Sequence, residues 1–242
     1  MKVWFVSDLH FSHVNILYFK PKRRETAGIT LEELRGTMKE HPMAPGVYLT
    51  EKSGLSKEEL IEKHDKWLIN RWNEQVQRGD VVYILGDFCL GNSIRTERIL
   101  SQLHGKKFLI RGNHDKSCNG LERYFVGVYD IKEAKFDHGQ FPFIKDGETF
   151  CVEMCHYPMV TWNRRPHGTV NLHGHVHGTL DQQNKDSKEL RLDVGLDGAM
   201  ANYHLISLED IYSYFREIVD NAGCATFQDY AEKLMAEQGY RI

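Results

Sequence analysis

Three alternating histidines occur in the segment His173-Gly174-His175-Val176-His177. In an extended chain, side chains two positions apart point the same way, so His175 and His177 can present two imidazoles to one point. A neutral imidazole is a common ligand for divalent metal ions. The alternative is a polar strand end whose histidines face solvent or are hydrogen-bonded in a core. Acidic partners elsewhere in the chain would decide between the two interpretations.

Polar residues follow three strand-like runs, at 3–6, 81–85 and 107–110, which are apolar apart from Lys107. Short continuous apolar runs indicate strands that are buried on both faces. Helical patterns at about 56–76 and 93–103 separate the runs, and strands that alternate with helices predict parallel pairing with right-handed crossovers. We therefore expect the strand ends to meet at one edge of a sheet, where open α/β sheets bind ligands.

The polar residues at the expected strand ends form a set with metal-binding chemistry. Two carboxylates, one carboxamide and five imidazoles are more than one zinc ion needs. They suit two divalent ions that share a carboxylate, an arrangement that clamps an in-line displacement at phosphorus with the ions about 3.5–4 Å apart. The set comprises Asp8, His10, Asp87, Asn113, His114, His156, His175 and His177.

The order of these residues resembles that of the calcineurin-like metallophosphoesterases. The stretch from Asp8 to Ile16 and the segment from His156 to Asn163 look more like those of the small bacterial and phage members. That family carries the motif series D-x-H, G-D, G-N-H-[DE], a lone H, and G-H-x-H. Here the series is Asp8-Leu9-His10, Gly86-Asp87, Gly112-Asn113-His114-Asp115, His156 and Gly174-His175-Val176-His177. Five motifs in the same order are far more specific than any one of them.

The resemblance implies two metal sites with a shared carboxylate. The implied ligands are Asp8, His10 and His177 for one ion, Asn113, His156 and His175 for the other, and Asp87 for both. His114 is then not a ligand but contacts the phosphate and protonates the leaving oxygen. A hydroxide that bridges the metals attacks phosphorus in line, since two cations lower the pKa of water and neutralise phosphoryl charge. The implied cofactor is two divalent ions, with Mn²⁺ favoured over Fe, Zn, Co or Ni.

The resemblance also implies an α/β fold, a four-layer α/β/β/α sandwich of two mixed β-sheets. The second half of the chain is compatible, because it shows short strand patterns typical of a more antiparallel second sheet, at 129–135, 149–155, 168–172, 190–194 and 204–207. We expect one domain over residues 1–242, closed by helices at about 208–238. Prolines and glycines predict an insertion at about 20–57, over the sheet edge or near the site, with a short helix at 31–38.

Five further residues are candidates for substrate binding. His13 and Asn15 follow the first motif and could reach the phosphate, with a loop hydrogen bond as an equal alternative. Arg111 could clamp phosphate, although such an arginine is more often a solvated charge. Asn163 and His167 lie on the loop between two ligand-bearing strands. They are candidates for specificity, and a plain surface loop is the alternative.

Several residues near the motifs are interpreted as structural. His173 is left out of the ligand set. Asp193 and Asp197 lie near glycines, as is typical of turn residues. Trp67 on the long helix is assigned to the core, whereas Trp162, next to the candidate loop, is the better candidate for stacking on a base.

Composition limits the partners and the compartment. The 242-residue chain has a net charge of −3 with 27% charged residues, and no basic stripe indicates a long nucleic acid partner. The five cysteines form no C-x-x-C pair, so we expect reduced thiols and a cytoplasmic protein. The N-terminus does not resemble a signal peptide, and no apolar run is long enough for a membrane span.

Together these observations predict a metal-dependent phosphoester hydrolase, with a phosphodiesterase acting on small, nucleotide-like substrates favoured. A phosphoprotein substrate is disfavoured, because Gly86-Asp87 does not continue into the G-D-x-x-D-R-G motif of Ser/Thr protein phosphatases. The alternatives are a phosphomonoesterase, a nuclease, and a catalytically silent scaffold of the same fold. The scaffold is disfavoured because the implied ligands and His114 are all present. The oligomeric state is left open.

Overall fold

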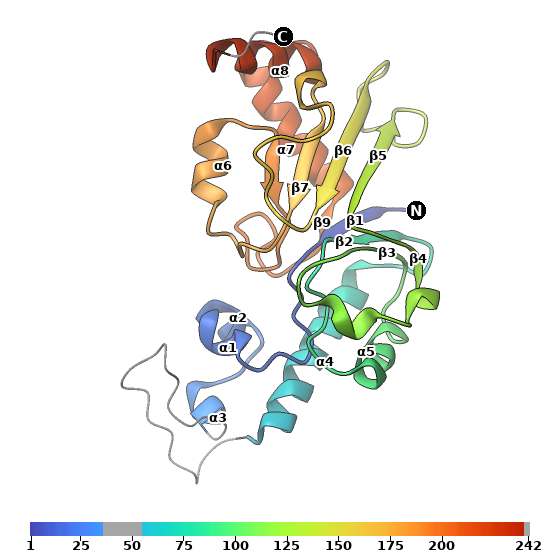
Figure 1. Cartoon of the computed structure of the whole chain (residues 1–242), viewed down its shortest axis with the longest axis vertical. Coiled ribbons are helices and arrows are strands. Elements are labelled where there is room, and N and C mark those ends of the chain that lie inside the picture. The colour runs from blue at the N-terminus through green and yellow to red at the C-terminus, as the bar shows by residue number, and fades with distance from the viewer. Residues whose placement is uncertain (36–54, 240–242) are drawn as a thin grey trace.

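The computed structural model describes residues 1–35 and 55–239, and Figure 1 shows their arrangement. The first of two sheets has the strand order β4-β3-β2-β1-β9. β1 to β4 pair in parallel, and β9 is antiparallel to β1. The strands are β1 (Val3–Val6), β2 (Val81–Ile84), β3 (Lys106–Ile110), β4 (Phe125–Tyr129) and β9 (Ile206–Ser207). The predicted parallel order of the first three strands is thus confirmed.

The second sheet has the strand order β5-β6-β7-β8. β5 is antiparallel to β6, whereas β6, β7 and β8 pair in parallel. The strands are β5 (Ile131–Asp137), β6 (Thr149–Cys155), β7 (Val170–His173) and β8 (Arg191–Asp193). Both sheets are mixed, as predicted, but the second is less antiparallel than its strand pattern indicated.

Side-chain alternation along β1 divides the interior into two cores. Val3 and Phe5 belong to a core shared with the second sheet, whereas Trp4 and Val6 pack with α4 (Lys57–Gln75) and α5 (Ser93–Leu100). Successive side chains of a strand point to opposite faces of the sheet. The first sheet is therefore buried on both sides, which explains why its strands are continuous apolar runs.

The long helix α4 begins with a capping box. The Ser56 hydroxyl accepts a hydrogen bond from the Glu59 N–H at 3.3 Å, and the Glu59 carboxylate accepts one from the Ser56 N–H at 2.8 Å. These bonds satisfy amide groups that have no partner within the helix. The helix predicted over 56–76 is confirmed, and its Trp72 is fully buried against the first sheet.

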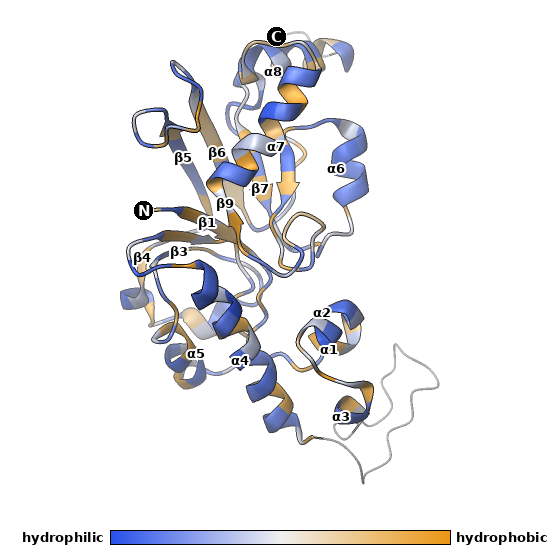
Figure 2. Ribbon diagram, turned by 180° about the vertical axis from the view of Figure 1, so that it is seen from behind, coloured by the Kyte–Doolittle hydropathy of each residue, from blue (hydrophilic) through white to orange (hydrophobic). Residues whose placement is uncertain are grey.

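Helices also cover the second sheet (Figure 1). Helices α7 (Leu208–Asn221) and α8 (Phe227–Glu237) join the core that this sheet shares with the first, and both carry hydrophilic and hydrophobic residues in Figure 2. Helix α6 (Asp181–Ser187), which was not predicted from the sequence, contacts β8, and its Asn184 is hydrogen-bonded to His173 of β7. The predicted α/β class, two mixed sheets flanked by helices, is confirmed.

Two strand predictions in the second half are confirmed only in part, over 131–135 and 206–207. Residues 129–135 do not form one strand, because the chain leaves β4 at Tyr129 and enters β5, in the other sheet, at Ile131. Residues 206–207 pair with β1 rather than with the second sheet. Both segments are short and lie at sheet edges, where few apolar side chains need burial and the sequence pattern is weak.

The segment 16–35 contains α1 (Ile16–Phe19), which precedes the predicted insertion, and α2 (Pro21–Thr26) and α3 (Leu31–Arg35), which lie in its described part. Apolar side chains from this segment, such as Leu17 and Ile29, form a small core with Leu60 and Ile61 of α4. Residues 36–54 of the insertion, including the end of the helix predicted at 31–38, lie outside the described residues. None of the described helices has both the length and the apolar character of a membrane span.

Candidate metal centre

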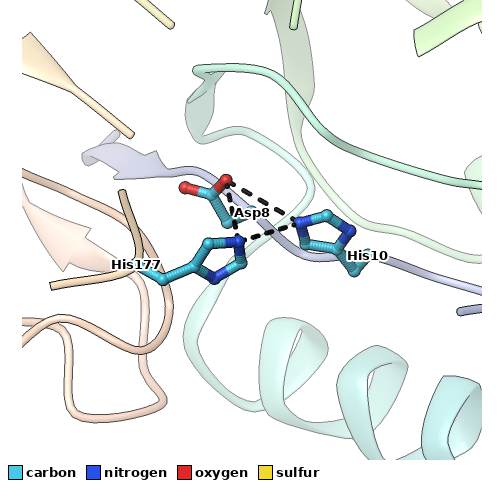
Figure 3. A group of neighbouring side chains, drawn as sticks. All are labelled: Asp8, His10 and His177. Carbon is cyan, nitrogen blue, oxygen red and sulfur yellow. Dashed lines mark hydrogen bonds and ion pairs between the residues drawn. The ribbon is translucent and has the colours of Figure 1, made fainter. Parts of the chain in front are cut away.

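Two groups of potential metal ligands lie where the strand ends meet. The first, which we call site A, consists of Asp8, His10 and His177, and its ligand atoms lie within 4.8 Å of one another. In Figure 3 the two imidazoles face the carboxylate of Asp8. The Nε2 atoms of His10 and His177 are 3.2 Å apart, and they lie 3.8 and 3.7 Å from Asp8 Oδ1.

The second group, which we call site B, consists of Asp87, His156 and His175 together with Asn113. The ligand atoms of the first three lie within 4.8 Å of one another. The side-chain oxygen of Asn113 is 3.1 Å from His156 Nε2. The structure therefore assembles all seven predicted ligands into two adjacent groups of mixed oxygen and nitrogen donors.

The carboxylate of Asp87 faces both sites. Its Oδ2 atom lies 3.7 Å from His10 Nε2 in site A, and its Oδ1 atom lies 3.6 Å from His156 Nε2 in site B. One oxygen toward each group is the arrangement expected of a carboxylate that bridges two ions.

The chemistry of the donors fits divalent cations. Asp8 is fully buried, and its Oδ1 atom has no hydrogen-bond partner. A buried carboxylate oxygen without a partner is costly unless a cation compensates for its charge. Burial lowers the pKa of His10 and of His175, which favours the neutral imidazoles that metals bind.

The backbone is strained at the ligands themselves. Positive φ angles of 51–71° occur at Asp8, His10, Asp87, His175 and His177. A non-glycine residue in this region costs of order 1–3 kcal/mol, and such residues cluster at functional sites. Gly174 explains how the strand ends approach so closely, since a Cβ atom there would lie 2.5 Å from Asp8 Oδ2.

Two of the ligand imidazoles are oriented through their Nδ1 atoms. His156 Nδ1 lies 2.7 Å from the carbonyl oxygen of Leu85, and His177 Nδ1 lies 2.7 Å from Asp197 Oδ2. A neutral imidazole that donates its Nδ1–H to these oxygens leaves the Nε2 lone pair for a metal. In both residues Nε2 is the atom that faces the other ligands.

His114 lies next to the ligands without belonging to either group. Its backbone N–H donates to Asp87 Oδ1 at 2.9 Å, its side chain is exposed, and its ring centre is 6.0 Å from that of His10. It borders a cleft of about 280 Å³ that Lys116 and Ser117 also line. The position gives the imidazole access to a molecule bound at the two sites.

The neighbouring Asp115 builds the loop on which His114 lies. Its carboxylate accepts hydrogen bonds from the backbone N–H groups of Gly112, Asp87 and Phe88, at 2.7, 3.0 and 2.7 Å. The sequence analysis gave this residue no role. The structure shows that it ties the loop after β2 to the loop after β3, and so positions Asp87 relative to His114.

Three of the candidate substrate-binding residues lie near the strand ends. His13 Nδ1 is 3.3 Å from His10 Nδ1, and burial, followed by the nearby His10, lowers the pKa of His13 to about 4. Asn15 is half-buried at the start of α1. Arg111 is exposed, and its backbone N–H continues the pairing of β3 with β4 through Tyr129.

The structure does not bring Asn163 and His167 to the metal groups. Because β6 and β7 are parallel, the loop that leaves the site after β6 must return to the opposite end of β7. On the way, Asn163 is bound to the middle of the strands, since its side-chain amide donates to Glu133 of β5 at 2.9 Å and its backbone N–H donates to Glu153 of β6 at 3.3 Å. His167 lies further along, in a short 3₁₀ helix, Arg165–His167, that packs against α8.

Trp162, on the same loop, is buried, and its indole N–H donates to the Thr169 carbonyl at 2.7 Å. The prediction that it stacks on a base is therefore wrong, since its ring packs in the core.

Three other residues, His173, Asp193 and Asp197, were interpreted as structural from the sequence. Both ring nitrogens of His173 are occupied by hydrogen bonds, to Gly174 O and to Asn184. Asp193 is the last residue of β8 rather than a turn residue, but its carboxylate stabilises neighbouring loops by accepting from the N–H groups of Gly178 and Gly195. The turn interpretation of Asp197 misses its main contacts.

Asp197 is bound to His177 and to Arg23, and the sequence gave no signal for either contact. Its Oδ2 atom accepts from His177 Nδ1 at 2.7 Å and from Arg23 at 2.6 Å. Arg23 and Asp197 are 174 positions apart, and neither belongs to a motif. No local spacing could have paired them.

Fold and site together define a class of protein, namely two-sheet α/β proteins with two adjacent metal-binding groups at the strand ends. The family model described as calcineurin-like phosphoesterase matches residues 1–208. The chain belongs to this family, whose members hydrolyse phosphoesters with the help of metal ions. The resemblance seen in the five motifs is thereby confirmed.

Several proteins are similar along most of their length. The gene 66 proteins of Mycobacterium phages D29 and L5 are 27% and 26% identical, covering 90% and 92% of this chain and 96% and 98% of the phage proteins. An uncharacterized protein of Methanocaldococcus jannaschii is 22% identical, over 86% of this chain and 88% of its own. A crystal structure of a protein of unknown function from Aquifex aeolicus has a TM-score of 0.55 at 21% identity, over 88% of this chain and 98% of that one, and shows the same fold.

Proposed function

We propose that the chain is a phosphodiesterase for small, nucleotide-like substrates that uses two Mn²⁺ ions and His114 as general acid. The position of Asp87, with one carboxylate oxygen toward each ligand group, carries this proposal. When bound, the two ions supply the positive charge that neutralises a phosphoryl group and activates a water molecule for in-line attack. The chain's own residues then have to hold the ions, orient the ester and protonate the leaving group.

In this proposal, site A would hold one ion, site B including Asn113 would hold the other, and the carboxylate of Asp87 would serve both sites. Carboxylate, amide and imidazole donors without a thiolate support Mn²⁺, while Fe, Zn, Co and Ni accept the same donors. A neutral amide oxygen from Asn113 adds a ligand without adding negative charge that would repel a phosphate.

His114 donates the proton to the leaving oxygen. Its exposed imidazole borders the cleft, which offers space for the leaving alcohol beside Lys116 and Ser117. Its backbone is fixed by the hydrogen bond to Asp87. The backbone of the proton donor is therefore held next to the carboxylate of Asp87, and its imidazole stands beside the cleft in which general acid catalysis would take place.

Electrostatics support a diester over a monoester. His13 beside site A stays neutral at physiological pH because burial lowers its pKa to about 4, so it adds no charge there. A phosphodiester has one negative charge, whereas a monoester carries up to two and needs more cationic contacts. In this proposal His13 and Asn15 contact the ester through hydrogen bonds and Arg111 contacts its phosphate, while Asn163 and His167 would contact only a larger substrate.

The compartment is also part of the proposal. All five cysteines are free thiols. Free thiols are typical of proteins in reducing compartments, and they support a cytoplasmic location.

The test compares hydrolysis of bis-p-nitrophenyl phosphate with that of p-nitrophenyl phosphate in Mn²⁺, with Asp87→Asn as the control. A preference for the diester supports the phosphodiesterase, and the next substrates are then cyclic and linear dinucleotides. A preference for the monoester supports a phosphomonoesterase. Hydrolysis of neither ester by a chain that binds two Mn²⁺ ions would contradict the proposal and favour a scaffold.

A further inference from the structure

The guanidinium of Arg23 in α2 is buried next to site A, with 0% of the residue exposed. It donates to both oxygens of the Asp197 carboxylate, at 2.8 and 2.6 Å. It also donates to the backbone oxygens of Leu9 and Asp8, at 3.1 and 2.7 Å. A bidentate arginine–carboxylate pair fixes the relative orientation of its partners more strictly than a single hydrogen bond does.

Both arms of site A depend on these contacts. On one side, Asp197, which Arg23 holds in place, fixes the orientation of the His177 imidazole by accepting a hydrogen bond from its Nδ1 atom at 2.7 Å. On the other, Arg23 binds the carbonyl groups in the loop from Asp8 to His10, where those two ligands have φ angles of 56° and 51°. One side chain thus holds the two chain segments that supply all three ligands of site A.

Site B has different supports. His156 is oriented by the carbonyl of Leu85, and the backbone N–H of His175 is held by Asp8 Oδ2 at 2.9 Å. Among the described residues, the hydrogen bonds of Arg23 and Asp197 reach ligands of site A and none of site B.

We propose that Arg23 and Asp197 are positioning residues that assemble site A selectively, so that the segment carrying α2 is part of the metal centre rather than a cover over it. The inference rests on the proposed two-metal centre but not on the substrate. An outer carboxylate that orients a metal-binding histidine typically contributes 10–100-fold to metal affinity. The affinity of site A should therefore depend on this pair, and that of site B should not.

The test measures Mn²⁺ affinity by calorimetry in two single-site backgrounds, His175→Ala to remove site B and His177→Ala to remove site A. Asp197→Asn keeps the shape of the side chain but removes its charge. We expect it to weaken Mn²⁺ binding by about 10–100-fold in the His175→Ala background. In the His177→Ala background we expect no change. An unchanged affinity in the first background, or equal weakening in both, would overturn the inference.

A matched control is available in the same chain. Arg165, on the loop between β6 and β7, and Glu189, between α6 and β8, form another largely buried bidentate pair, with Arg165 Nε 3.0 Å from Glu189 Oε2. Glu189→Gln should lower the unfolding temperature and leave Mn²⁺ affinity unchanged at both sites. A loss of Mn²⁺ from Glu189→Gln equal to that from Asp197→Asn would show that the effect is general destabilisation, and would overturn the inference.

Arg23→Lys keeps the positive charge but loses the bidentate geometry. It provides a second test of the inference if Asp197→Asn does not fold. Equilibrium dialysis of the full chain should then find one tightly bound Mn²⁺ per chain instead of two. Two tightly bound ions in this variant would overturn the inference. Failure of the proposed function is distinguishable, because it would appear in the unmutated chain as fewer than two bound ions or as no ester hydrolysis.

Discussion

Sites A and B are adjacent and chemically alike, yet different kinds of group hold them in place. In site B, the imidazole of His156 is oriented by a backbone carbonyl at the end of the β2 strand run. In site A, the imidazole of His177 is oriented by the side chain of Asp197, which Arg23 holds in turn.

Backbone supports are present in any sequence that forms the same strands, whereas side-chain supports can be lost through a single substitution. The comparison therefore predicts that single mutations can adjust site A more readily than site B. Two residues connect the sites. Asp87 faces both of them, and Asp8 of site A accepts from the backbone of His175 in site B.

The largest expected effect comes from the shared carboxylate. Asp87→Asn removes the negative charge that faces both groups, so we expect both ions to be lost together. The loss of one transition-state contact lowers activity by about 10²–10³-fold, and we expect a larger fall for this variant. Metal content by mass spectrometry and diester hydrolysis measure the two losses. A variant that keeps one tightly bound ion would show that one site binds its ion without the carboxylate of Asp87. The statement that Asp87 connects the two sites would then be wrong.

The next effect separates proton donation from metal binding. His114→Ala should retain two ions and slow turnover by about 10²–10⁴-fold, because general acid catalysis is lost while both ligand groups stay intact. The slowing should be smaller for a nitrophenyl ester, whose leaving group needs no proton. Turnover of an alkyl and a nitrophenyl diester, together with metal content, provides the check. Equal slowing for both esters would argue against a proton-donating role.

A third substitution acts on the contact between the sites. A Cβ atom at Gly174 would lie 1.9 Å from Ser7 Oγ and 2.5 Å from Asp8 Oδ2, the atom that accepts the His175 N–H. Gly174→Ala should therefore push Asp8 away from His175 and weaken Mn²⁺ binding at both sites, by about 10–100-fold. Calorimetric titration in the two single-site backgrounds measures each site. Weakening of site A alone would show that site B does not depend on Asp8.

The parts of the centre that were predictable from the sequence depend on local signals. The apolar runs that form β1, β2 and β3 are continuous because both faces of the first sheet are buried. The ligands follow these runs directly, and His175 and His177 are separated by one residue. Short spacing and strand ends were sufficient to place these residues together.

What could not be predicted depends on pairing between distant segments. The orientation of β7 relative to β6 takes the end of the loop, around His167, to the far end of the sheet, and the sequence does not show which strands pair in parallel. The contact of Arg23 with Asp197 joins positions 174 residues apart. It depends on how α2 packs, and no periodicity in either segment reports it.

The smallest predicted effect concerns the packing beneath site A. His64 of α4 is fully enclosed, stacks on Trp67 with ring centres 5.8 Å apart, and has no hydrogen-bond partner at either ring nitrogen. Burial, followed by the nearby charge of Arg23, lowers the pKa of His64 well below its ordinary value. The imidazole is therefore neutral in the folded chain, whereas in the unfolded chain it takes up a proton below about pH 6.5.

Because the unfolded state binds the additional proton, His64 lowers the free energy of unfolding as pH falls below about 6.5, by up to about 1.4 kcal/mol per pH unit, and has no such effect above that pH. His64→Leu removes this contribution, so its stability should decline less between pH 7 and pH 5.5 than that of the unmutated chain. Urea unfolding of the metal-free chains at both pH values measures the difference. Parallel pH curves would mean that His64 is protonated equally in both states. His64 would then make no acid-sensitive contribution to the stability of the packing beneath site A. The difference between the supports of sites A and B would depend on Arg23 and Asp197 alone.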